Sequence, residues 1–275
     1  MKFDMGAAWN EAVAMISANR EVLAIVAGIF FFLPTLLVTM LGPDMSAMFA
    51  MGSDPEQIEQ MSEQVLAAYG DIWWLYALAT VAQILGYISL LTLLRDEGRP
   101  TVGEAISMGV KGLLPSIGAY LLASFGIALL FVAIVALAAL TGIEALAAVA
   151  VLVGLVVMVY VMIKFSLSAP VIAIEKVSNP VAVLRRSWTL TKGNSFRLLG
   201  FFGLIFIAYF VISMIAGLIT AGVMATVGGE VGKFLQGVLG GLLGMVATIV
   251  IVAVLAAAHR QLAGPSAGAA GRIFD

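Results

Sequence analysis

Few side chains in this sequence could perform covalent or acid–base chemistry. The chain has no cysteine and a single histidine, His259. Without cysteine it can form no disulfide, thiolate nucleophile or cysteine-based metal site, and one histidine cannot build a histidine-cluster metal centre. No acid or nucleophile stands beside His259 in the sequence. We therefore expect no catalytic residue, no bound metal and no cofactor.

A run of carboxylates, "SDPEQIEQMSEQ", is the other group that could do chemistry. It contains Asp54, Glu56, Glu59 and Glu63. Paired carboxylates can act as acid and base or bind Ca²⁺. The run lacks the Asp/Asn/Gly spacing of a calcium loop, so we interpret it as a solvated acidic face of an external loop that could form a short helix.

The stretch "NPVAVLRRSWTLTKGNSFRLLGF" lies between two long apolar runs and carries four cations and one tryptophan. Asn179 is suited to cap a helix, and Pro180 to its first turn. Gly193 and Asn194 are typical of a helix end. The stretch therefore predicts a helix over 180–192.

This predicted helix has two unlike faces. At 100° per residue, one broad arc holds Val181, Val183, Leu184, Trp188, Leu190 and Thr191, and the other holds Arg185, Arg186, Thr189 and Lys192. Such a helix suits the membrane interface, with its tryptophan at headgroup level and its cations facing phosphates. Three interpretations stay open: the cations set topology and anchor the helix, they form a site for an anionic headgroup or ligand, or they contact a partner protein. The candidate headgroup contacts are Lys164, Arg185, Arg186, Trp188, Lys192 and Arg197.

Lys164 lies inside an apolar run. Its distance from the start of that run predicts a position near the cytoplasmic interface, where a lysine can extend its ammonium group to the headgroups. An intramembrane functional site is the alternative, and it would need a polar partner. Gln83, Tyr87 and Tyr160 are the candidates for that partner. Pro170 predicts a bend further along the same run.

The elements that carry these residues must be membrane helices. The chain has 275 residues, of which 62% are hydrophobic and 11% charged, whereas soluble domains carry about 25% charged residues. Apolar runs of bilayer length recur, and in lipid they must be helical because a lone strand would leave its backbone unpaired. The six predicted spans are 22–42, 72–94, 113–140, 145–174, 198–225 and 234–258. They form one membrane domain, 1–258, and 259–275 is predicted to be a flexible cytoplasmic tail.

The distribution of cations predicts the orientation. Of the 14 Lys and Arg residues, 12 lie in alternate segments that include both termini, one lies on the opposite side, and Lys164 lies within a span. The positive-inside rule places both termini in the cytoplasm and the 43–71 loop outside. Each cytoplasmic segment ends in a short amphipathic stretch that precedes an outgoing helix. We therefore predict three parallel repeats, each an interfacial helix followed by a transmembrane hairpin.

Small residues form ridges on the last two predicted spans. "GVLGGLLG" contains two overlapping GxxxG patterns, and the fifth span carries a similar small-residue ridge. Such ridges allow helix backbones to approach closely, either within one chain or between two copies. The candidate packing residues are Ser213, Gly217, Ala221, Gly237, Gly240, Gly241 and Gly244.

The stretch that begins "APVIAIEKVSNPVAVLRRSW" resembles a known family. The matching features are Pro170, Glu175, Pro180, Leu184, the "RRSW" and "LTKG" motifs, Arg197, and "RPTVGEA" at 99–105. They resemble the membrane domain of some glycerophosphodiester phosphodiesterases and of stand-alone YciC-like bacterial inner-membrane proteins. The resemblance implies a six-helix bacterial inner-membrane protein. It does not imply the phosphodiesterase activity, which belongs to a separate soluble domain.

These patterns favour a non-enzymatic protein that organises something at the cytoplasmic face. Its expected partners are membrane lipids, above all anionic ones, and either a membrane protein or a second copy of the chain. No nucleic-acid partner is expected. The alternative is a transporter or channel component for a hydrophobic or lipid-like substrate, because polar cargo usually needs intramembrane charges. An intramembrane enzyme ranks third because clustered His, Asp or Cys side chains are missing.

Overall fold

A computed structural model describes residues 2–42, 55–95 and 100–264, and all regular structure within these ranges is helical. The helices are α1 (Met5–Ala27), the π-helix η1 (Gly28–Phe32), α2 (Leu33–Leu41), α4 (Pro55–Leu93), α5 (Val102–Ala139), α6 (Glu144–Phe165), α7 (Ser168–Ala173), α8 (Pro180–Leu190), α9 (Ser195–Val227) and α10 (Gly229–Ala263). Six stretches are long and apolar enough to cross a membrane: Met5–Leu41, Tyr69–Leu93, Val102–Ala139, Glu144–Ala173, Ser195–Val227 and Gly229–Ala263. The predicted all-α class and six apolar segments are confirmed.

The boundaries differ from the prediction at several points. The fourth predicted span is divided, because α6 ends before Pro170 and the short helix α7 follows a break. The last helix continues past the predicted end at 258, and residues 265–275 of the predicted tail lie outside the described residues. In the acidic run, Asp54 also lies outside them, and the chain from Pro55 onward belongs to α4.

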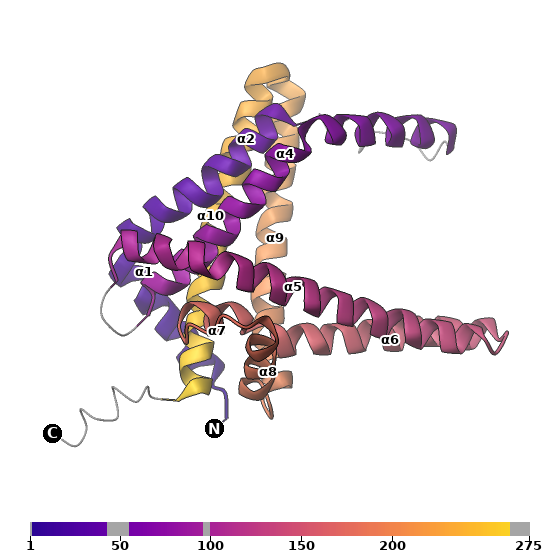
Figure 1. Ribbon diagram of the computed structural model, residues 1–275. Helices are drawn as coiled ribbons and strands as arrows, with labels where there is room; N and C mark the ends of the chain where they lie inside the picture. Colours follow the sequence, from indigo (N-terminus) through magenta and orange to yellow (C-terminus); the bar gives the residue numbers. More distant parts are fainter. Residues whose placement is uncertain (1, 43–54, 96–99, 265–275) are drawn as a thin grey trace.

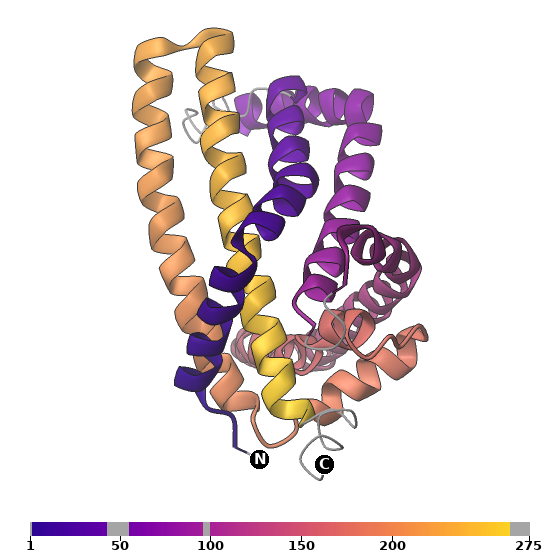
Figure 2. The same cartoon turned by 90° about the vertical axis from the view of Figure 1, so that its left-hand side faces the viewer.

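Two irregularities shape the first apolar helix. Pro34 has no N–H, so the carbonyl of Phe30 loses its helical partner, and the backbone forms the wider π-turns of η1 directly before α2. Asn19 has non-helical dihedral angles, φ −125° and ψ 16°, and its side-chain amide donates to the carbonyl of Met15 at 2.9 Å. Kinks of this kind arise where a side chain competes for helix carbonyls. The bent helix follows α10 over much of its length (Figure 2).

α5 begins at a reciprocal cap. The backbone N–H of Thr101 donates to Glu104 Oε2 at 2.8 Å, and the N–H of Glu104 donates to Thr101 Oγ1 at 3.3 Å. This capping box satisfies two N–H groups that the helix leaves free. From there α5 continues as one 38-residue helix through Pro115. The predicted interfacial stretch and the third predicted span are therefore parts of one helix.

The helices do not form three equivalent hairpins. α1, α2, α9, α10 and the part of α4 after its kink at Ile72 run along one another, whereas α5 and α6 lie side by side and project away from them at a steep angle (Figures 1 and 2). The part of α4 before the kink also projects to the side (Figure 1). Helices that cross one bilayer tilt from its normal by at most about 40°. In this arrangement α5 and α6 are not parallel to α9 and α10. The predicted threefold repeat is not confirmed.

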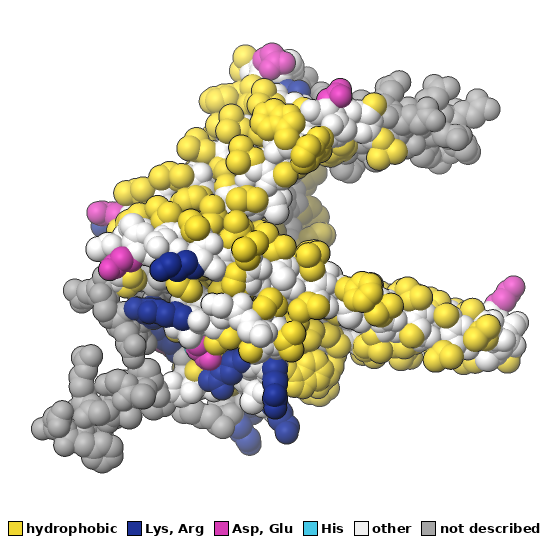
Figure 3. Space-filling model, viewed as in Figure 1, with side chains coloured by type: hydrophobic (Ala, Val, Ile, Leu, Met, Phe, Trp, Pro, Cys, Tyr) yellow, Lys and Arg dark blue, Asp and Glu magenta, His cyan; other side chains and the backbone are white. Residues whose placement is uncertain are grey.

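The hydrophobic core lies at one end of the molecule. α10 is buried on all sides over residues 252–259, but α9 buries only Ser195, Leu198 and Phe201 near its start. α7 is almost wholly buried in the same region, and Phe3 is 1% exposed there. Elsewhere large apolar side chains cover the surface, as Figure 3 shows for α5 and α6. Water would not tolerate so large an apolar surface on one protein, which agrees with helices that lie in lipid.

Only two of the small residues proposed for close helix packing sit against another helix. A Cβ atom on Gly237 would lie 2.7 Å from a methyl carbon of Leu36, and one on Gly241 would lie 2.8 Å from the ring of Phe32. A Cβ atom on Gly217, Gly240 or Gly244 would meet nothing within 4 Å. Ser213 is half-buried and Ala221 is exposed. The ridge on α10 thus packs against η1 and α2 within one chain, through Gly237 and Gly241.

Gly241→Leu should lower the melting temperature of the protein in detergent and in nanodiscs. The added side chain must displace Phe32, and overpacking of this kind costs about 1–3 kcal/mol. Gly240→Leu is the matched control, because Gly240 is the preceding residue of the same helix and a Cβ atom there would face open space. Equal melting temperatures for the two variants would contradict the packing described for α10.

Candidate functional site: a polar network at the basic end

Polar side chains gather at the end of the molecule that holds the core. We name it the basic end and define it as residues 2–12, the segment from Lys164 to Phe201 and the last turns of α10 from Val252. Figure 3 shows lysine and arginine side chains on this end, below α5 and α7. The fully or nearly buried polar residues here are Lys164, Ser187, Thr191, Asn194, Ser195 and His259. A buried polar group needs a hydrogen-bond partner, so their contacts define the site.

α8 begins where its sequence predicts and ends two residues before the predicted end at 192. Asn179 Oδ1 accepts from the N–H groups of Val181 and Ala182 at 2.9 and 3.2 Å, and Pro180 occupies the first turn. The helix ends at Leu190, and Gly193 then adopts φ +81°, a conformation that glycine enters without steric cost.

The face that α8 buries differs from the predicted apolar arc. Val183, Ser187 and Leu190 are buried, but Val181, at the edge of that arc, is 64% exposed. The helical period of apolar residues does not identify this face, because Ser187 at its centre is polar. It is buried because its hydroxyl donates to the carbonyl of Lys164 at 2.8 Å. α8 is therefore docked onto the end of α6 by a polar contact.

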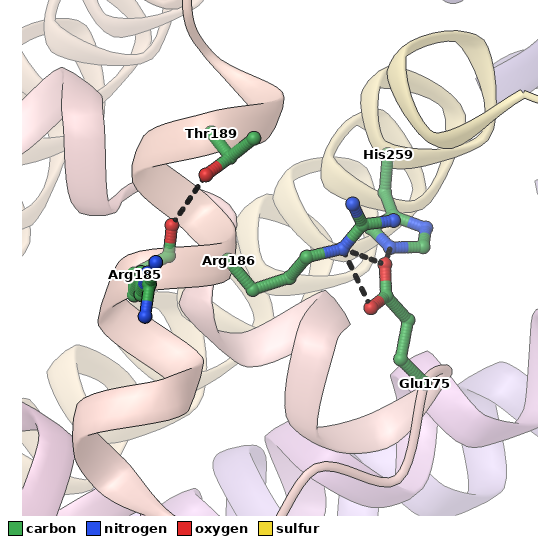
Figure 4. A network of polar contacts seen from close by, with 5 residues as sticks. All are labelled: Glu175, Arg185, Arg186, Thr189 and His259. Carbon is green, nitrogen blue, oxygen red and sulfur yellow. Dashed lines mark hydrogen bonds and ion pairs between the residues drawn. The ribbon is translucent and has the colours of Figure 1, made fainter.

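A second network joins α8 to α10 (Figure 4). Glu175, between α7 and α8, accepts from Arg186 Nε at 2.8 Å through Oε2 and at 3.1 Å through Oε1. Its Oε1 lies 2.9 Å from His259 Nε2, and the His259 side chain is 4% exposed. An ionised carboxylate only accepts hydrogen bonds, so Nε2 of His259 carries the proton in this contact. One carboxylate thus holds together a loop and two helices.

The charge state of Glu175 follows from this setting. Burial raises the pKa of a carboxyl group, but the hydrogen bonds from His259 and Arg186, together with their charges, outweigh it and lower the pKa of Glu175 to about 2. A carboxylate with a folded-state pKa below its ordinary value adds stability above that ordinary value. This stability is lost as the pH falls from about 4.5 towards 2.

Lys164 does not extend to the interface as expected. Its side chain is 3% exposed, and Nζ lies 5.4 Å from the ring centre of Tyr160 and 5.3 Å from that of Trp188. Nζ also donates to the carbonyl of Thr191 at 3.5 Å. The ammonium group is therefore enclosed by two aromatic rings and one carbonyl. Of the three partners considered from the sequence, only Tyr160 is among its contacts in the described part of the chain.

The N-terminal segment closes the basic end from a third side. The N–H of Phe3 donates to Asn194 Oδ1 at 2.8 Å, and Arg197 donates to the carbonyl of Phe3 at 3.0 Å. Asp4 and Gln261 exchange two hydrogen bonds at 3.1 and 3.2 Å. These contacts fix Arg197, which the sequence proposed as a headgroup contact, to the start of the chain.

The six candidate headgroup contacts thus divide into three groups. Arg185 and Lys192 are exposed and remain suited to that role, and Trp188 is 39% exposed. Arg186 is held by Glu175, and Arg197 by Phe3. Lys164 is 3% exposed and is enclosed by Tyr160, Trp188 and the carbonyl of Thr191. Within residues 2–42, 55–95 and 100–264, no three His, Asp or Glu side chains gather as a metal-binding group.

Sequence reasoning missed the Glu175–His259 contact. The two residues are 84 positions apart, and no periodicity links them. One signal was available: Glu175 belongs to the motif that carries the family resemblance, and His259 ends an apolar helix where a lone polar side chain needs a partner.

Glu175→Gln should lower the melting temperature at neutral pH, because hydrogen bonds to a charged group contribute about 1.5–3 kcal/mol each. Arg186 is 41% exposed, so the loss belongs at the lower end of that range. The difference between wild type and Glu175→Gln should shrink as the pH is lowered from 4.5 towards 2, measured by thermal unfolding in detergent. Glu144→Gln, at the tip of the α5–α6 hairpin, is the control. A difference that stays constant over this pH range would contradict the assignment.

Comparisons with models of known protein families, with curated proteins and with solved structures found no match to this chain. The geometry of the basic end and the apolar surface that extends from it are therefore the guides to function.

Proposed function

We propose that this chain is a non-enzymatic, multi-pass protein of the bacterial inner membrane that organises anionic lipid, or a partner protein, at the cytoplasmic face. Both termini are cytoplasmic in this proposal. The resemblance to the stand-alone membrane domains described above is part of it. The six apolar helices are compatible with a polytopic membrane protein.

The observation that carries the proposal is the separation of charge from apolar surface. Arg185 and Lys192 are exposed on and just after α8, and the network around Glu175 fixes this helix against the core. The helices that leave the basic end are covered with exposed apolar side chains (Figure 3). Fixed, exposed cations beside a lipid-facing surface are suited to attract anionic headgroups, each by about 1 kcal/mol.

A transporter component for a hydrophobic or lipid-like substrate is the second candidate. It is favoured by an apolar groove of about 580 Å³ between α5 and α6, which α7 and Leu184 close at the basic end. Its lining includes the hydroxyl groups of Ser124, Ser166 and Ser168. Transport would require this groove to open to both membrane faces in turn, whereas lipid organisation requires only a static site.

Topology is tested by single cysteines, since the chain has none of its own. Lys192→Cys reports on the basic end, and Val231→Cys, at a position 61% exposed, on the turn between α9 and α10. In spheroplasts an impermeant thiol reagent should label Val231→Cys directly and Lys192→Cys only after permeabilisation. The reverse pattern would mean that the basic end lies outside.

Headgroup attraction is tested by the double substitution Arg185→Gln/Lys192→Gln. It should weaken the affinity for anionic lipid by about 2 kcal/mol, or roughly 30-fold, while all spans stay inserted. Arg20→Gln/Lys111→Gln removes the same charge from exposed positions outside α8 and is the matched control. Retained lipid is measured by native mass spectrometry from nanodiscs that contain phosphatidylglycerol and phosphatidylcholine. Equal retention in the two double variants would eliminate α8 as the contact surface.

A further inference from the structure

Lys164 is a cation without a counter-ion in the described part of the chain. None of the ion pairs found there includes it, although its side chain is 3% exposed and lies in a stretch long and apolar enough to cross a membrane. An ionisable group at such a position is costly and usually marks a functional site. Two aromatic rings and one carbonyl stabilise the ammonium group, but they supply no negative charge.

The carbonyl that Lys164 contacts is already shared. Thr191 O accepts from Lys164 Nζ at 3.5 Å and from Ser195 Oγ at 3.2 Å. The contact with Lys164 is therefore long and competes with a shorter one. The positive charge of Lys164 is left largely uncompensated by the protein atoms around it.

An apolar groove begins beside this charge. It has a volume of about 470 Å³ and lies between α6 and α9, within the range of roughly 300–1,000 Å³ that is typical of ligand sites. Tyr160, whose ring covers the ammonium group, lines it, and so does Ser195. From Ile163 the groove follows α6 back to Leu155, about 12 Å at 1.5 Å per residue. Its exposed wall of Val156, Val159 and Phe196 leaves it accessible from the bilayer.

We propose that this α6–α9 groove, together with Lys164, Tyr160 and Trp188, forms a binding site for one anionic phospholipid. An acyl chain occupies the groove, and the headgroup lies at Trp188 and the exposed Lys192, where the charge of Lys164 beneath the rings of Tyr160 and Trp188 favours a negative headgroup over a neutral one. This inference rests on the proposed function and deepens it: α8 attracts anionic lipid in general, whereas the Lys164 site selects and holds a single molecule.

The occupant must match both the apolar groove and the positive charge of Lys164. A free phosphate or nucleotide would leave the apolar groove empty, and a neutral lipid would leave the charge of Lys164 uncompensated. A lipid with one negative headgroup satisfies both, and it can enter sideways from the membrane that surrounds the exposed wall.

Trp188 provides a direct readout. The other three tryptophans, Trp9, Trp73 and Trp74, are all exposed, so replacing them with phenylalanine leaves Trp188 as the only reporter. Phosphatidylglycerol and phosphatidylcholine with brominated acyl chains quench nearby tryptophan fluorescence on contact. The ratio of their quenching efficiencies in reconstituted vesicles measures the preference of the site for a negative headgroup.

In this background, Lys164→Met should reduce the preference for phosphatidylglycerol by about five-fold, the effect of one cation near a membrane surface. The fold should survive, because the hydrogen bonds that Ser187 and Thr191 donate to residue 164 use its backbone carbonyl and methionine fills the same apolar space. Lys233→Met is the matched control, since Lys233 also donates to a carbonyl, that of Gly42 at 3.2 Å, but at the opposite end of α10. Val159→Phe, which narrows the groove, should reduce quenching by phosphatidylglycerol without removing any charge.

The outcomes separate this inference from the proposed function. An unchanged lipid preference in Lys164→Met would overturn the role of the buried cation, and unchanged quenching in Val159→Phe would overturn the groove. Equal quenching of the wild type by both lipids would show that the site has no preference for a negative headgroup, which would also overturn the proposal. In each case a loss of anionic-lipid retention in Arg185→Gln/Lys192→Gln would leave the proposed function standing. If neither lipid quenches Trp188, α8 does not lie at the membrane, and both proposals fail.

Discussion

The structure depends on the concentration of its polar contacts at one end. Lipid is as apolar as the side chains of these helices, so the hydrophobic effect cannot sort one helix against another within it. Specific contacts must do so, and here they lie between the N-terminal segment, the region around α8 and the last turns of α10. Glu175 joins the region around α8 to the last turns of α10, because one carboxylate accepts from both Arg186 and His259.

The same constraint explains why the helices diverge. α9 is held by buried residues only near its start, and α6 buries only Ala150, Gly154 and Lys164 over 22 residues. Beyond Ala119 the α5–α6 pair buries few side chains, and so does α9 beyond Phe201. A rigid base with apolar arms is suited to hold charges at a fixed depth while lipid fills the space between the arms, and both grooves open along α6.

Local signals in the sequence predicted the helices well, but not their faces. Six apolar runs, the Asn179 cap and the glycine after α8 all follow from residues within a few positions of one another. By contrast, a helix that is apolar all round carries no periodic signal for the side that packs. For that reason the sequence does not say which helix Gly237 and Gly241 contact. The enclosure of Lys164 and the Glu175–His259 contact depend on residues distant in sequence, which no local pattern encodes.

The two hydrogen bonds between Asp4 and Gln261 can form only at the end of synthesis. These residues are 257 positions apart, so at roughly 5–20 residues per second about 13–50 s pass between their syntheses. For most of that interval the partners of Phe3 have not been synthesised. These are Asn194, whose side chain accepts from the Phe3 N–H, and Phe201, whose ring lies 5.4 Å from that of Phe3. The nascent chain therefore passes through a state in which the first helix has been made but the residues that it packs against have not. Until α10 emerges, that helix remains accessible to the insertion machinery and to other membrane components.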